Sequence, residues 1–221
     1  MPVAVAGLVG CGGGSGSSAA SASGSAKAST NGALTAATLR EALLTQVNGV
    51  AAAAPASSGN YASMTAASKQ VGGGVQVTPK ACTGAATVGF DPDALAASPA
   101  AAVTFRVGTN GVSEVLIGSS ATSASTALAG HVPAGCAKYE ETVGGKTYTY
   151  GITEKSVSGI GEQARLLNVH AIGATADDMW SLIYEGKGFV GTVTVVGPNA
   201  SQQAVTELGQ QAYDFATKSL S

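Results

Sequence analysis

Hydrophobic positions along residues 35–221 follow two periods, and the first of them is helical. Apolar residues at Leu39, Leu43, Val47 and Val50 lie three or four positions apart and predict a helix, which a capping box at residues 38–41 would open. Residues 61–71 and 119–132 show a weaker pattern of the same kind. A final helix is predicted over residues 201–220, with an apolar stripe of Val205, Leu208, Ala212, Phe215 and Leu220.

Between these helices apolar and polar residues alternate, which is the period of β-strands. Residues 103–107 and 112–117 flank Asn110-Gly111, a dipeptide typical of a hairpin turn. Residues 51–59 are expected to form a loop. Two further hairpins are predicted, from residues 136–143 with 146–153 and from residues 179–185 with 189–196, and single strands are expected at 75–77 and 164–172.

Successive hairpins favour a mostly antiparallel sheet, and amphipathic helices must bury their apolar stripes against it. We therefore expect an α+β fold. It would form a single domain over residues 34–221, with the sheet covered on one face by the helices.

The composition is poor in charged and in aromatic residues. Charged residues make up 11% and aromatic residues 5% of the chain, and the net charge is −2 with no basic run. Nucleic acid is therefore not an expected partner, because binding its phosphates takes clustered Lys and Arg. With two histidines and no C-x-x-C pattern, we expect neither a metal site nor a cofactor.

A short apolar run near the N-terminus ends in a cysteine. Residues 2–10 are fewer than the roughly 20 that span a bilayer, and they have the length of the apolar region of a signal peptide. Leu8-Val9-Gly10-Cys11 resembles a lipobox, the bacterial signal for attaching diacylglycerol to the cysteine. We therefore expect a lipoprotein signal segment over residues 1–11 and attachment through Cys11 to the outer face of the cytoplasmic membrane.

Residues 12–33 are predominantly Gly, Ser and Ala, and this composition predicts a flexible linker. The signal segment before it lacks the basic residues that normally precede the apolar region. We expect either a start codon upstream of Met1 or a truncated N-terminus. A chain that truly began at Met1 would stay in the cytosol without a lipid.

Three cysteines occur, at Cys11, Cys82 and Cys136. If Cys11 carries a lipid, the remaining two form an even pair that can be oxidised outside the cytosol. The alternative is two buried free thiols.

Five side chains on the predicted strands are candidates for ligand binding. If their hairpins share a face, the aromatic ones line an apolar cleft for a lipid or glycan fragment, with an arginine as polar anchor. The alternative is that the aromatic residues form the core. The candidates are Tyr148, Tyr150, Arg165, Trp180 and Tyr184.

Catalytic motifs are weak. The G-x-S-x-G pattern of a nucleophile elbow is absent, and a serine of Gly118-Ser119-Ser120, between a strand and a helix, is better explained as a helix cap. His131 and His170 are more simply ordinary surface or half-buried histidines than bases. Residues 159–164 fit G-x-G-x-x-A, but they lead into a strand and not a helix, so we expect a glycine-rich turn. No catalytic residue is predicted.

The layout and the cysteine placement resemble a known family. The resembling features are Pro79-Lys80-Ala81-Cys82, the strand at 103–107, the helix leading into Pro133-Ala134-Gly135-Cys136, and the closing helix. They resemble the extracellular sensor domain of the mycobacterial Ser/Thr kinase PknH and the mycobacterial lipoproteins related to it. The resemblance covers roughly residues 35–221 and implies an antiparallel sheet backed by helices around a cleft. The kinase sensor has two disulfides, whereas this chain can form only one.

These features predict a non-catalytic, lipid-anchored cell-envelope protein whose sensor-like domain binds a small envelope ligand or a partner protein. Two alternatives stay open. The first is a periplasmic carrier of envelope lipids, which needs a large apolar cavity. The second is a cell-wall hydrolase that uses Ser119 or a His/Asp pair.

Overall fold

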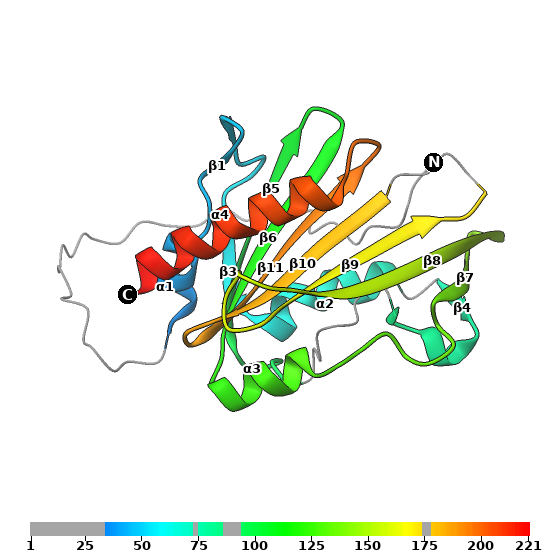
Figure 1. Ribbon diagram of the computed structural model, residues 1–221, viewed down its shortest axis with the longest axis horizontal. Coiled ribbons are helices and arrows are strands. Elements are labelled where there is room, and N and C mark those ends of the chain that lie inside the picture. The colour runs from blue at the N-terminus through cyan, green and yellow to red at the C-terminus, as the bar shows by residue number, and fades with distance from the viewer. Residues whose placement is uncertain (1–33, 73–74, 86–93, 174–177) are drawn as a thin grey trace, which may run out of the picture.

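The computed structural model describes residues 34–72, 75–85, 94–173 and 178–221. The predicted signal segment (1–11), the linker (12–33) and Cys11 lie outside the described residues. The described part is built on one nine-stranded sheet in which every neighbouring pair is antiparallel (Figure 1). Four α-helices accompany it in these residues, so the α+β prediction is confirmed.

The strands of the sheet, in their spatial order, are β3 (Ser57–Asn60), β5 (Pro99–Val107), β6 (Asn110–Gly118), β11 (Phe189–Gly197), β10 (Asp178–Gly186), β9 (Ala164–Ala171), β8 (Lys146–Val157), β7 (Lys138–Val143) and β4 (Gln76–Thr78). This order departs from chain order in two places, because β6 lies beside β11 in the middle of the sheet and β4 lies at the edge opposite β3. A separate small hairpin pairs β1 (Gln46–Val47) with β2 (Val50–Ala51).

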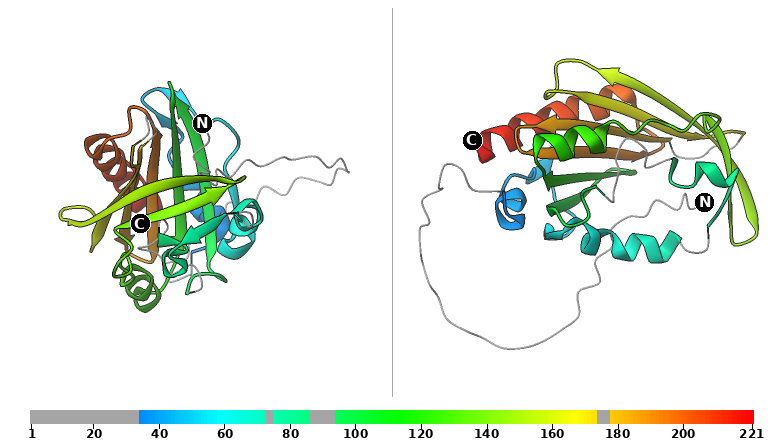
Figure 2. Two further views of the ribbon diagram at one scale, coloured as in Figure 1. Left: turned by 90° about the vertical axis from the view of Figure 1, so that its right-hand side faces the viewer. Right: turned by 90° about the horizontal axis from the view of Figure 1, so that it is seen from below.

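Helices pack on both faces of the sheet, which corrects the prediction that they cover one face only. α1 (Ala36–Glu41) and α4 (Gln202–Leu220) cover the first face, where they pack with Leu182, Tyr184 and Val193. α2 (Tyr61–Gly72) and α3 (Ala121–Leu128) lie on the second face, where α3 packs with Ile183 and Val190. In the view from below, the strands lie between α4 and α2 (Figure 2, right).

Helices are needed on both faces because side chains alternate between the two faces along each strand. β10 is buried on both faces, so its apolar residues need partners on both sides. α3 provides the partners on the second face, because its Ala124 and Leu128 pack against Ile183 and Val190. Its short length and alanine content gave little sign of that role in the sequence.

The first predicted helix is shorter than expected. Its capping box is formed by Thr35 and Thr38, three residues earlier than predicted, and the helix ends at Glu41. Asn48 and Gly49 then adopt positive φ and form the turn between β1 and β2. An Asn-Gly pair is a strong hairpin signal, so the sequence contained the reason for the break.

The Asn-Gly turn expected at residues 110–111 lies two residues earlier than predicted. β5 and β6 do form a hairpin, but Val107 pairs with Asn110 and the turn is Gly108-Thr109. Gly108 supplies the positive φ. Asn110 is occupied elsewhere, because its Oδ1 accepts the backbone N–H of Asn199 at 3.2 Å.

Two further expectations need correction. Part of the predicted loop at 51–59 is the edge strand β3, which pairs with the alanine-rich start of β5. In α4, the buried stripe contains Val205, Leu208 and Ala212 as expected, but Phe215 is 37% exposed and Ala216 takes its place in the core.

Cys82 and Cys136 form a disulfide, with an S–S distance of 2.08 Å, which confirms the predicted pair. The bridge joins the 3₁₀ turn after β4 (Lys80–Cys82) to the loop before β7. It lies in a second core, separate from the main one beneath α1 and α4. This second core consists of Cys82, Ala85, Cys136, Tyr139, Tyr150, Ile152 and Val169.

Leu34, the first described residue, packs beside Gly118 at the end of β6 and Gly188 in the turn between β10 and β11. The β8–β9 loop lies at the same end of the sheet, because the Glu162 N–H donates to the Glu185 carbonyl at 2.9 Å. The N-terminal part of the chain therefore enters the domain at the end of the sheet that carries this loop.

Gly191 in β11 provides space for the ring of Tyr184. A Cβ at position 191 would overlap this fully buried ring, with Tyr184 Oη 2.5 Å away. We expect Gly191→Ala to lower the free energy of unfolding by about 1–3 kcal/mol through overpacking, measured by urea denaturation. Gly111→Ala in β6 is the control, because nothing lies within 4 Å of its Cβ position. Equal stability of the two variants would contradict this prediction.

Candidate functional site

The structure separates the five predicted binding residues into two groups. Trp180 and Tyr184 point to the face covered by α1 and α4, whereas Tyr148, Tyr150 and Arg165 lie on the opposite face, as strand alternation and register require. The expected common aromatic cleft is therefore not formed.

The aromatic candidates have structural surroundings. Tyr184 is fully buried and meets the rings of Phe189 and Tyr213 edge-on, at centroid distances of 6.3 and 5.7 Å. Tyr150 stacks on Tyr139 at 5.5 Å in the second core. These contacts favour the alternative that the aromatic residues form the core.

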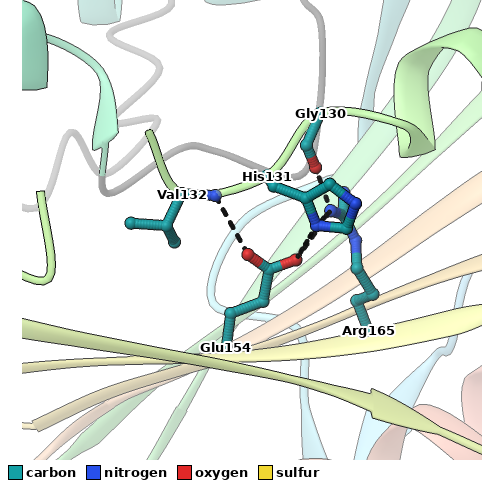
Figure 3. A network of polar contacts seen from close by, with 5 residues as sticks. All are labelled: Gly130, His131, Val132, Glu154 and Arg165. Atoms are coloured by element: carbon teal, nitrogen blue, oxygen red, sulfur yellow. Dashed lines mark hydrogen bonds and ion pairs between the residues drawn. The ribbon is translucent and has the colours of Figure 1, made fainter. Parts of the chain in front are cut away.

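Arg165 is the candidate with an unusual environment. It is the second residue of β9, its side chain is only 8% exposed, and its Nη1 lies 2.7 Å from Glu154 Oε1 (Figure 3). Nη1 also donates to the carbonyl of Gly130, in the loop after α3. Glu154 is on the neighbouring strand β8, two positions from the residue paired with Arg165, so sheet register brings the two charges together.

The Glu154 carboxylate joins this network to the loop after α3. Its Oε1 lies 2.9 Å from His131 Nδ1, and its Oε2 accepts the Val132 N–H at 3.0 Å. Partial burial acts to raise the pKa of Glu154, but the hydrogen bonds from Val132 and His131 and the charge of Arg165 outweigh it and lower the pKa. Glu154 is therefore a stable anion that fixes Arg165 and the loop.

The rest of the Arg165 guanidinium has no partner among the described residues. Nε and Nη2 are buried and make no hydrogen bond to any described residue. Together these two nitrogens carry three N–H donors. A buried donor without an acceptor costs about 1–3 kcal/mol, so a native protein that keeps three of them calls for an explanation.

Arg165 also lines a pocket of about 470 Å³, hereafter the Arg165 pocket. Its walls are the end of α3, His131, and residues 156–165 of the β8–β9 hairpin and its loop. This volume is within the range of small-molecule sites, about 300–1,000 Å³. The pocket therefore has the size to hold a small ligand beside Arg165.

The wall of the pocket is the glycine-rich turn expected from the sequence. Gly159 and Gly161 have positive φ, which glycine adopts at no steric cost. At Gly161 there is also no room for a Cβ, because it would overlap the Glu185 carbonyl. The G-x-G-x-x-A pattern thus encodes a tight β8–β9 connection, and its role in a pocket was not predicted.

Glu154 was missed as well. The sequence predicted a strand ending at residue 153, whereas β8 continues to Val157. The signal that could have found it is the alternation itself, since Tyr150, Ile152 and Glu154 fall on one face and the nearest strand carries an arginine.

The residues considered for hydrolysis are not brought together. Ser119 Oγ is buried without a hydrogen bond, and no hydrogen bond in the described residues joins it to His131 or His170. Ser120, and not Ser119, is the cap of α3. His170 instead contacts Asn168 Oδ1 through its Nδ1 at 3.2 Å.

Two further features are absent from the described residues. They contain no group of three or more His, Cys, Asp or Glu side chains able to hold a metal ion. No helix among them has the length and hydropathy needed to cross a membrane.

A second buried acid lies in the main core. Glu114 of β6 is 1% exposed, and its Oε2 accepts the Leu44 N–H at 2.8 Å. Its Oε1 and the Tyr184 hydroxyl make no hydrogen bond within the described part of the chain. Burial raises the pKa of Glu114 to about 7, and the Leu44 N–H offsets this only in part. The pKa of Tyr184 is also raised, by burial and then by the charge of Glu114.

Comparison with known proteins finds similarity in structure only. No protein-family model matches the sequence, and no curated protein matches it. The fold is similar to that of the extracellular domain of PknH from Mycobacterium tuberculosis, with a TM-score of 0.53 and 13% identity, covering 86% of this chain and 98% of that domain. The expected likeness to this domain is thus confirmed at the level of the fold. A Mycobacterium smegmatis protein, the Rv0999 ortholog, matches at a TM-score of 0.37 and 13% identity, covering 77% and 84%, too low to carry an argument.

Proposed function

We propose that this chain is a non-catalytic, lipid-anchored protein of the cell envelope, whose sensor-like domain recognises a small envelope ligand in the Arg165 pocket. The observation that carries the proposal is a buried guanidinium that retains three free N–H donors beside a pocket of ligand size. The fold likeness to an extracellular domain supports an envelope location.

A purely structural role explains only one part of the arginine. Nη1 ties β8 and β9 to the loop after α3, and a lysine or a smaller residue that reached Glu154 would serve the same purpose. Nε and Nη2 are left to bind an acceptor that the described part of the chain does not provide. A ligand oxygen at this position would recover the free energy of the missing hydrogen bonds.

Binding in this pocket is tested by screening a library of small polar and apolar fragments against the ¹⁵N-labelled protein by NMR. We expect hits to shift the amide resonances of residues 158–163. Ser156→Trp should weaken these hits at least about tenfold, because Ser156 is exposed at the pocket wall and an indole there blocks it. Thr153→Trp is the matched control, exposed on the opposite face of the same strand. Fragment hits whose affinity is unchanged by Ser156→Trp would contradict the proposal.

The anchor is a separate part of the proposal. The Cys82–Cys136 bridge supports an oxidising location, where such bonds persist. We expect mass spectrometry of the protein, expressed in a bacterial host with a complete signal peptide, to find Cys11 as the N-terminal residue carrying diacylglycerol. Cys11→Ser should release the protein from the membrane fraction. A mature chain with an unmodified Cys11 would refute this part and leave the ligand pocket unaffected.

The two other candidate functions fit the site less well. A lipid carrier needs apolar walls, whereas serines, glycines, Glu162, Gln163 and Arg165 make up most of this pocket. A hydrolase needs a nucleophile within hydrogen-bond reach of a base, and Ser119 has no such contact within the described residues.

A further inference from the structure

We infer that the Arg165 pocket selects an uncharged, hydroxyl-rich ligand, such as one sugar unit of an envelope glycan. This inference rests on the proposed function, because it names the chemistry of the ligand that the pocket would bind. It follows from three properties of the site: free donors, an excess of negative charge around them, and a wall rich in acceptors.

The donors come first. Arg165 Nε and Nη2 point no hydrogen atom at any described protein acceptor, so the ligand must supply oxygen atoms. The positive charge itself is already balanced, since Glu154 lies 2.7 Å from Nη1. What Arg165 offers a ligand is therefore hydrogen bonding and not a net positive charge.

The charges around the pocket argue against an anion. Glu162 lines it, and Glu185, only 6% exposed, receives a hydrogen bond from the lining residue Gln163 at 2.6 Å. With Glu154, three carboxylates line the pocket or contact its lining residues, whereas Arg165 is the one Lys or Arg among the lining residues. A carboxylate or phosphate ligand would meet this excess of negative charge, and placing like charges side by side weakens binding.

A cation cannot pair with the free nitrogens of the arginine. An ammonium group brought next to Nε and Nη2 would face three N–H donors and find no acceptor there. A hydroxyl group both donates and accepts, so it can bond to Arg165 and to acceptors such as the Ser158 hydroxyl and the Glu162 carboxylate. Leu128 and Ile160 add a small apolar area for the C–H groups of a sugar ring.

Three sugars on one ring skeleton test this chemistry: methyl glucoside (uncharged), glucuronate (anionic) and glucosamine (cationic). Each is titrated into the full-length ¹⁵N-labelled protein, with the Arg165 Nε–H resonance and the amides of residues 158–163 as readouts. We expect methyl glucoside to shift the Arg165 resonance and to bind at least about tenfold more tightly than either charged sugar. Ser156→Trp should abolish the shift, and Thr153→Trp should retain it.

The outcomes separate this inference from the proposed function. Tighter binding of glucuronate or glucosamine overturns the inference, and so does binding of methyl glucoside that leaves the Arg165 resonance unmoved. If fragments bind the pocket and none of the three sugars does, the inference fails and the proposed function stands. If neither fragments nor sugars respond to Ser156→Trp, both fail.

Discussion

Replacing both Cys82 and Cys136 by alanine is expected to lower the free energy of unfolding by about 4 kcal/mol. The bridge closes a loop of 54 residues, and in the chain-entropy model a loop of this length constrains the unfolded chain by about that amount. The loss should be uneven across the molecule. The second core contains both cysteines, and the edge strand β4 holds to β7 through only three paired residues.

Urea denaturation of the oxidised protein and of the double variant measures the difference. Chemical reduction of the unchanged protein provides a check, because it opens the bridge without a substitution. Cys11→Ser is the matched control and should leave the stability unchanged. Hydrogen exchange should accelerate most in β4, β7 and β8. A loss below about 1 kcal/mol, or one spread evenly over all strands, would contradict the prediction.

The second large effect concerns pH. Between pH 4.5 and about 7 the folded protein keeps the Glu114 proton that the unfolded chain has already released. The free energy of unfolding must therefore fall as the pH rises through this window, by about 3 kcal/mol in total. Glu114→Gln removes the titration and keeps an oxygen for the Leu44 N–H. Its amide group also offers a donor toward the Tyr184 hydroxyl.

Denaturation of both proteins at pH 5 and at pH 8 gives the test. As the pH rises, the free energy of unfolding should fall by about 3 kcal/mol less in the variant than in the unchanged protein. The variant should therefore be the more stable of the two at pH 8. The difference between the two curves isolates Glu114, because the shifted carboxyls of Glu141 and Glu154 are present in both proteins. Glu140→Gln, at an exposed position of β7, should follow the unchanged protein. If the free energy of unfolding falls equally with pH in Glu114→Gln and in the unchanged protein, the prediction is refuted.

Much of the sheet could be predicted from the sequence because its hairpins are local. The turns at Gly144-Gly145 and near Gly188 have strands on both sides whose apolar residues alternate. β3 could not be predicted, because Ser57–Asn60 contains no apolar residue and becomes a strand only by pairing with β5, some 40 positions away. The same dipeptide, Asn-Gly, forms a turn at 48–49 and not at 110–111, since Gly108 and the Asn110–Asn199 contact decide the second case.

The site was predicted in one residue only. Arg165 was expected to be the polar anchor of a cleft, and it lines the pocket. The sequence left open whether the aromatic candidates line a cleft or form the core, because the faces of Trp180 and Tyr184 depend on the register of β10 against β9. Glu154, Gly130 and His131 join Arg165 only once the loop after α3 has folded back over β8.

The position of Leu34 has a consequence for how ligand occupancy could be communicated. Leu34, at the N-terminal end of the described domain, lies beside the β10–β11 turn. Glu185, near the end of β10, accepts a hydrogen bond from the β8–β9 loop, which forms a wall of the Arg165 pocket. If Cys11 is the anchor, the linker joins the domain at the end of the sheet that carries the Arg165 pocket. A ligand bound in the pocket would then affect the β10–β11 turn next to Leu34 through Glu185, without a structural change across the rest of the sheet.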